Sequence, residues 1–92
     1  METLNFKIGE GFGLHARPAG VLVQTANKFK SNITVFKDGG NCASAKGLFA
    51  LLGLKVEAGD NIRFEIEGAD EGDARKAIQT LFDNGLKMPD VK

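Results

Sequence analysis

The sequence predicts an α+β fold with the segment order β-α-β-β-α-β-α. Each expected strand has one apolar and one polar face, which is typical of an antiparallel or mixed sheet covered by helices on one side only. Between the strands, the spacing of apolar residues changes to the helical period. Ninety-two residues suffice for one small core, so we expect a single domain over residues 1–92, with residues 88–92 as a loose tail.

The expected strands are short segments in which apolar and polar residues alternate. Leu4, Phe6 and Ile8 follow this pattern, and the pair Asp38-Gly39 is a strong hairpin signal. The strands are expected at residues 4–8, 33–37, 42–45 and 61–67.

Helices are expected at about residues 16–29, 46–53 and 71–84. Pro18 suits the first turn of a helix, where its missing N–H costs little. The middle segment is apolar enough to be a strand instead, but we interpret it as a short helix ended by Gly53. Asp70 is expected to cap the last helix, and Gly85 to end it.

Composition excludes several classes of function. The formal net charge is zero, whereas proteins that bind nucleic acid usually carry a basic excess. The longest apolar run, residues 48–52, is too short to insert in a membrane. A lone Cys42 and the absence of a signal peptide favour the cytoplasm. One histidine and one cysteine are too few for a zinc site, so no metal or other cofactor is expected.

Charge is distributed unevenly along the chain. Residues 1–56 carry seven Lys/Arg against three Asp/Glu, and residues 57–92 carry five against nine. The first half could therefore present a face to an acidic partner, or the charges could be scattered over a solvated surface.

The stretch Gly13-Leu14-His15-Ala16-Arg17-Pro18-Ala19 is the candidate functional site. It places the only histidine between a glycine-rich loop and an expected helix N-terminus. Free N–H groups and the helix dipole make such an end a ready anion site, and Arg17 adds a permanent cation. The same field disfavours the imidazolium form. A neutral, nucleophilic His15 that becomes a phosphohistidine is therefore a coherent hypothesis.

At these residues the chain resembles the HPr family, the histidine-containing phosphocarriers of the bacterial phosphoenolpyruvate:sugar phosphotransferase system. The resemblance extends over about residues 3–86 and includes Ser31-Asn32-Ile33-Thr34-Val35 and the segment 43–49. It implies an open-faced β-sandwich, in which three helices cover one face of a four-stranded antiparallel sheet.

The resemblance also implies roles for individual residues. His15 would take a phosphoryl group on Nδ1 from phosphorylated enzyme I and pass it to enzyme IIA domains for sugar uptake, as a monomeric carrier rather than an enzyme. Arg17 and Ala16 would contact the phosphate. Gly20, Leu48, Phe49 and Leu52 would form an apolar docking patch. From the sequence alone, core is the favoured interpretation of the segment 48–52, with Phe49 as its best candidate for exposure.

One position departs from the family pattern. Many members carry a regulatory serine after the lysine that begins the second helix, but here Gly47 follows Lys46. Control by a serine kinase is therefore not expected. Two alternatives stay open: a related regulatory, dihydroxyacetone-kinase or nitrogen-type phosphotransfer protein, and a small interaction domain in which His15 is structural.

Overall fold

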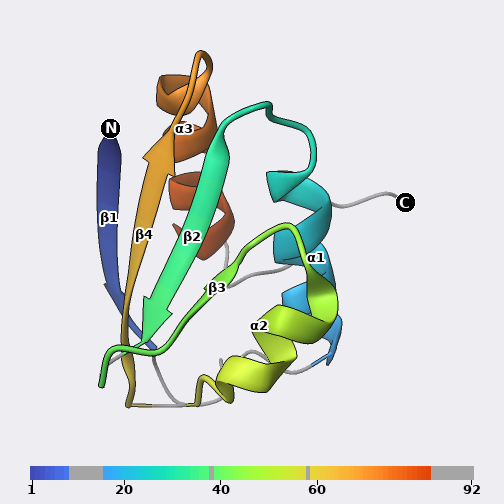
Figure 1. Cartoon of the computed structure of the whole chain (residues 1–92), viewed down its shortest axis with the longest axis vertical. Helices are drawn as coiled ribbons and strands as arrows, with labels where there is room; N and C mark the ends of the chain where they lie inside the picture. The colour runs from blue at the N-terminus through green and yellow to red at the C-terminus, as the bar shows by residue number, and fades with distance from the viewer. Residues whose placement is uncertain (9–15, 38, 58, 84–92) are drawn as a thin grey trace.

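The protein forms a four-stranded antiparallel sheet with three helices on one face (Figure 1). The computed structural model describes residues 1–8, 16–37, 39–57 and 59–83. The strands are adjacent in the order β1-β4-β2-β3. In chain order, the elements are β1 (Glu2–Lys7), α1 (Ala16–Ala26), β2 (Asn32–Lys37), β3 (Cys42–Ser44), α2 (Leu48–Leu54), β4 (Asn61–Glu67) and α3 (Glu71–Asp83). This architecture confirms the predicted fold class.

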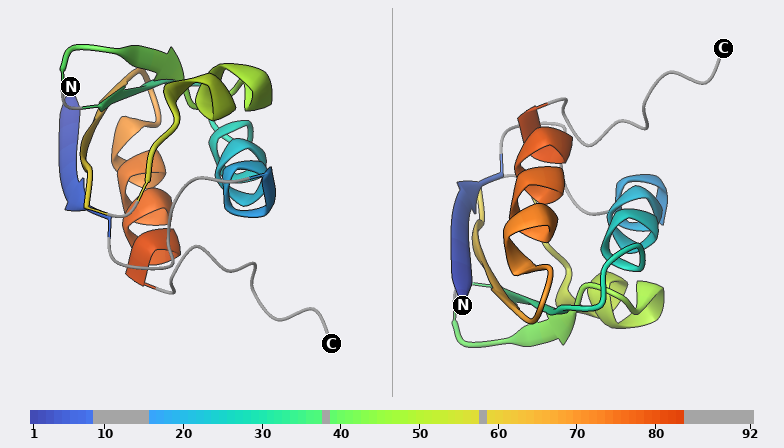
Figure 2. Two further views of the ribbon diagram at one scale, coloured as in Figure 1. Left: turned by 90° about the horizontal axis from the view of Figure 1, so that it is seen from below. Right: turned by 90° about the horizontal axis from the view of Figure 1, so that it is seen from above.

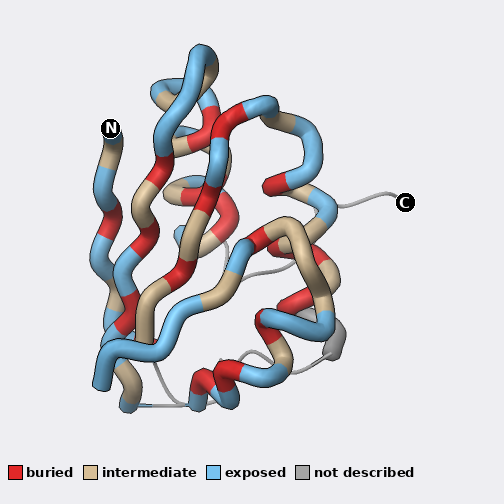
Figure 3. The backbone as a smooth tube through the Cα atoms, viewed as in Figure 1, coloured by how far each residue is buried: buried red, intermediate tan, exposed pale blue. Residues whose placement is uncertain are grey.

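The core lies between the sheet and the helix layer (Figure 2). Alternate strand residues point into it, because successive side chains of a strand project to opposite faces. Phe64 at the centre of β4 is fully buried, as are Leu22 of α1 and Ile78 of α3. The opposite face of the sheet carries no helix among the described residues and remains open, as its polar alternation predicted (Figure 3).

Three phenylalanines join α3 to the sheet. The rings of Phe6 in β1 and Phe82 in α3 are stacked with centroids 4.1 Å apart, and Phe64 meets both rings edge-on. Offset and edge-to-face pairs of this kind stabilise a core beyond the area that they bury. They hold α3 across β1 and β4, where it also packs against α1.

Three expected helix boundaries are wrong. The second helix begins at Leu48 rather than Lys46, because Gly47 is its N-cap residue. The first helix ends at Ala26 rather than near Phe29, because the N–H groups of Lys28 and Phe29 bond three residues back, in turn geometry. The second helix continues through Gly53 to Leu54 and ends where Lys55 adopts the left-handed conformation (φ 56°, ψ 47°). It is a helix, which excludes the strand alternative. The expected stop at Gly85 and the tail at residues 88–92 lie outside the described residues.

The N-terminal boundary of α3 is correct, and Asp70 occupies the cap position, because its carbonyl oxygen accepts from the N–H of Ala74 at 2.9 Å. Its carboxylate differs from the expectation, since it accepts hydrogen bonds from residues 30 and 31 rather than from the first turn of the helix. Glu71 reaches back so that one of its carboxylate oxygens accepts from the N–H of Gly68 at 3.1 Å. The carboxylate of Asp70 thus connects the turn before α3 to the turn before β2, which is distant in sequence.

Candidate functional site

The first helix begins at the residue that follows His15 in the chain. Because α1 starts at Ala16, its first turn supplies main-chain N–H groups without intrahelical partners. An eleven-residue helix also has a dipole whose positive end lies there. His15 itself lies outside the described residues, as do the side chains of Ala16 and Arg17. The described backbone thus fixes the helix N-terminus that the sequence predicted beside His15.

The second helix exposes an apolar surface. The side chain of Phe49 is 85% exposed, and Ala50 and Gly53 are exposed beside it. Leu48 and Leu52 are half-buried. An exposed phenylalanine among other apolar groups is unusual on a small monomeric protein and typically marks an interaction surface.

The inner side of α2 belongs to the core. Leu51 is fully buried and Leu54 nearly so. The core and the docking-patch interpretations of the segment 48–52 therefore each apply to one face of the helix. Leu51 belongs to the core, whereas Phe49 lies on the surface, as the sequence favoured. This division follows from the helical period, which places residues three apart on the same side.

Lys37 anchors the C-terminal end of α2. Its ammonium group donates to the carbonyl oxygens of Leu54 at 3.2 Å and Lys55 at 3.0 Å, and lies 3.6 Å from a carboxylate oxygen of Asp60. A cation suits a helix C-terminus, where carbonyls lack intrahelical partners. A helix of seven residues is marginal in isolation, so this contact and the buried leucines fix the surface that carries Phe49.

Lys46 and Asn27 connect the segment before α2 to the end of α1. The ammonium group of Lys46 donates to the carbonyl oxygen of Phe29 at 2.7 Å. The side-chain amide of Asn27 donates to the carbonyl oxygens of Val23 at 3.0 Å and Lys46 at 3.3 Å. These contacts hold α1 and α2 together as a pair (Figure 2).

Gly47 occupies the N-cap position of α2 and makes no side-chain capping bond. Just before it, the N–H of Lys46 donates to the hydroxyl oxygen of Ser44 at 3.1 Å, so Ser44 stabilises the turn that leads into the helix. A Cβ built on Gly47 would lie 3.5 Å from the Cβ of Ala50, which is ordinary van der Waals contact. The fold itself therefore does not require glycine at this position.

The predicted docking residues come from two helices that pack against each other. Leu48, Phe49 and Leu52 lie on α2, and half-buried Gly20 lies on α1, where an added Cβ would meet no atom within 4 Å. Sequence reasoning missed the anchoring roles of Lys37 and Lys46. Lys37 offered one weak signal, since the alternation of β2 places this lysine on the buried side of the sheet.

Among the described residues, no group of three or more His, Cys, Asp or Glu side chains could hold a metal ion. Within the same residues, no helix is both long and apolar enough to cross a membrane.

A family model described as "PTS HPr component phosphorylation site" matches residues 3–84. Phosphocarrier protein HPr of Mycoplasma genitalium is 34% identical over 83 residues, which cover 90% of this chain and 94% of the relative. A multiphosphoryl transfer protein of Vibrio cholerae is 40% identical over 86 residues, which cover 91% of this chain but 22% of that longer protein.

Solved structures show the same architecture. A protein described as "HPr-C-His" from Thermoanaerobacter tengcongensis superposes with a TM-score of 0.87 at 37% identity, over 97% of this chain and 99% of that one. A histidine-containing phosphocarrier protein from Mycoplasma superposes with a TM-score of 0.84 at 32% identity, over 96% and 100% of the two chains.

The open-faced sandwich, the pair of helices α1 and α2 with its exposed Phe49, and these relatives together define a small phosphotransfer carrier protein. The chain belongs to the HPr family, the phosphocarriers of the phosphotransferase system.

Proposed function

We infer that His15 is the phosphoryl acceptor of this carrier. The observation that supports this most directly is the start of α1 at Ala16, because it makes His15 the residue in the chain that directly precedes a helix end with unpaired main-chain N–H groups. When the imidazole attacks phosphorus, the phosphoryl group leaves its donor and bonds to a ring nitrogen, Nδ1 by resemblance to the family. The same bond is later broken by the next acceptor.

The helix terminus suits the phosphorylated form. It disfavours imidazolium before transfer, so His15 keeps a lone pair for attack. After transfer, the N–H groups of the first turn, including that of Ala16, and the guanidinium of Arg17 meet the new negative charge. His15 thereby becomes a relay that carries the group without turning over a substrate of its own.

The docking patch consists of Gly20, Leu48, Phe49 and Leu52. Phe49 is its centre, because a large exposed aromatic ring gains most from burial against a partner. The apolar patch lies on the helix pair that begins next to His15 in the chain. Phosphorylated enzyme I would dock here as donor, and enzyme IIA domains as acceptors, in the cytoplasm and with the carrier as a monomer.

Phosphoryl transfer from enzyme I tests the role of the patch. Phe49→Ala should lower kcat/KM for this protein as the acceptor about tenfold, because it removes the central contact. The unfolding midpoint should barely change, since the ring is 85% exposed. Thr80→Ala, an exposed change on α3, is the matched control and should leave both unchanged. An unaltered kcat/KM in Phe49→Ala would show that Phe49 is not part of the docking surface.

A further inference from the structure

A shallow hollow lies on the open face of the sheet, opposite the helix layer. Its volume is about 360 Å³, within the usual range for sites that bind small molecules. Strands β1, β2 and β4 supply its lining: Asn5, Phe6, Lys7, Phe36, Lys37, Asn61, Ile62 and Arg63. Nothing in the carrier role uses this face.

Two rows of side chains form the walls. In the first row, Asn5 is paired with Arg63, and Arg63 with Phe36, across three adjacent strands. In the second row, Lys7 is paired with Asn61. Residues two apart on a strand project from the same face and are separated by about 7 Å. The strand backbone between the two rows therefore forms the floor of the hollow.

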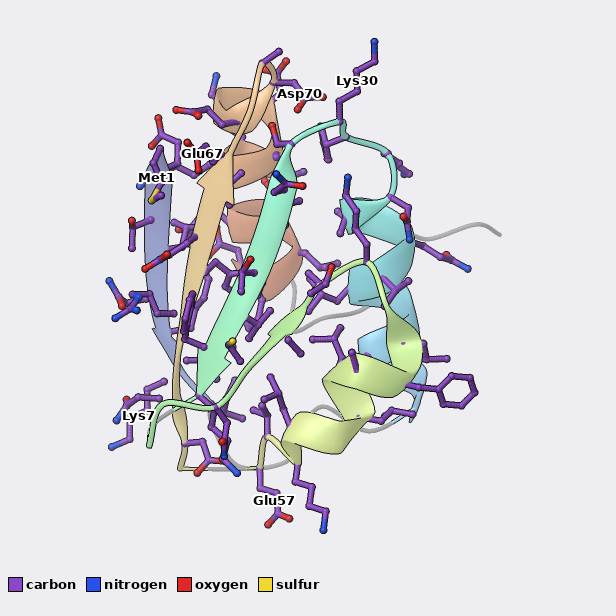
Figure 4. The ribbon with its side chains drawn as sticks, in the orientation of Figure 1. Met1, Lys7, Lys30, Glu57, Glu67 and Asp70 are labelled. Carbon is purple, nitrogen blue, oxygen red and sulfur yellow. The ribbon has the colours of Figure 1, made fainter. Side chains whose placement is uncertain are left out.

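The walls present two cations. Lys7 is exposed, and within the described part of the chain its ammonium group forms no ion pair or hydrogen bond; Figure 4 shows it at the lower end of the sheet. Arg63 uses one nitrogen for Glu65, with Nη2 3.1 Å from a carboxylate oxygen. A guanidinium has five N–H donors, so it can also bind an anion in the hollow.

A flat surface adjoins these cations. The guanidinium carbon of Arg63 lies 4.7 Å from the centroid of the Phe36 ring, a stacked cation–π arrangement. Stacking holds the planar group in place, so that less side-chain freedom is lost when its remaining donors bind. A planar ring can stack on the same pair of groups.

We propose that this hollow binds a small phosphate monoester with a planar ring, of the nucleoside monophosphate class. The phosphate lies between Lys7 and Arg63, where charge-assisted hydrogen bonds are strongest. The ring lies against the stacked pair of Arg63 and Phe36, and Asn5 and Asn61 line the hollow beside it.

Amide chemical shifts measured by NMR during titration test this site with AMP, adenosine and ribose 5-phosphate as probes. AMP should shift the signals of residues 5–7, 36 and 61–63, and bind more tightly than either fragment. Arg63→Gln and Lys7→Gln should each weaken AMP binding about tenfold. Lys76→Gln, which removes one exposed cation from α3 on the other side of the sheet, should leave it unchanged. Phe36→Leu should weaken AMP more than ribose 5-phosphate.

Several results would overturn the proposal. They are an absence of shifts around the hollow, equal binding of AMP and adenosine, or equal losses in Lys76→Gln and Arg63→Gln. Equal binding of AMP and ribose 5-phosphate would refute the stacked ring. Urea unfolding of each variant separates loss of the site from loss of the fold.

Discussion

The carboxylate of Asp70 joins the turn before α3 to Ser31, the residue that directly precedes β2. One carboxylate oxygen accepts from the N–H of Ser31 at 2.9 Å and also from its hydroxyl, while the other accepts from the N–H of Lys30 at 2.9 Å. Asp70 and Lys30 lie at the same end of the molecule (Figure 4). This contact joins residues about 40 positions apart in sequence, so it contributes to the tertiary fold and not only to a local turn.

Stability should fall in acid because of Asp70. The hydroxyl of Ser31, followed by the N–H of Lys30, lowers the pKa of Asp70 below its ordinary value of 3.8. A lowered folded-state pKa means that the carboxylate stabilises the fold above the unfolded-state pKa, and that this contribution is lost as pH falls through the lower, folded value.

Urea unfolding at several pH values below 5 measures this effect. Asp70→Asn should be less stable than the parent at neutral pH, and the difference should shrink in acid. The pKa of Glu71 is also lowered, first by its bond to the N-terminal ammonium group, so some acid dependence should persist in the variant. A constant difference between the two proteins over this range would contradict the role of Asp70.

Gly68 should not tolerate a side chain. A Cβ at this position would lie 2.6 Å from both the Cα and the Oγ of Ser31, closer than atoms can approach, and φ is 155°. Gly68→Ala should therefore reduce the free energy of unfolding by about 2–3 kcal/mol. Gly72→Ala is the control, because the added methyl group meets nothing within 4 Å and alanine favours the helix by up to about 1 kcal/mol. Equal stability of the two variants in urea would disprove the close packing.

Gly47→Ser should fold normally and be slightly more stable. The new Cβ fits at 3.5 Å from that of Ala50, and serine can cap α2 where glycine offers no side-chain bond. The gain should be a few tenths of a kcal/mol, roughly the difference between serine and glycine caps. A thermal unfolding comparison measures it. A marked loss of stability would show that glycine is required by the fold, rather than merely present in place of the regulatory serine of relatives.

Local patterns predicted much of the fold. Strict alternation in β4 places Ile62, Phe64 and Ile66 inward and Arg63 outward, and the structure has this arrangement. Such a pattern suffices because one buried face fixes the register. The exposure of Phe49 was also predictable, since the helical period separates it from Leu51.

Long-range polar contacts were not predictable in the same way. Asp70 followed the local rule for a helix cap, but its carboxylate accepts hydrogen bonds from Ser31, which is distant in sequence. The ends of the helices likewise depend on distant lysines: Lys37 binds the end of α2 and Lys46 the turn after α1. Apart from the inward position of Lys37 in the alternation of β2, the sequence pattern gives no sign of these pairs. The role of His15 rests on its sequence position and the family resemblance.

Phosphorylation of His15 is the most direct test of the account. Incubation with phosphoenolpyruvate and enzyme I should label the protein with phosphate that is lost in acid and retained in base, as expected for a phosphohistidine. His15→Ala should take up no label and should remain folded by circular dichroism. Label that persists in His15→Ala, or that never appears on the parent protein with several enzymes I, would contradict the assignment of His15 as the phosphoryl carrier.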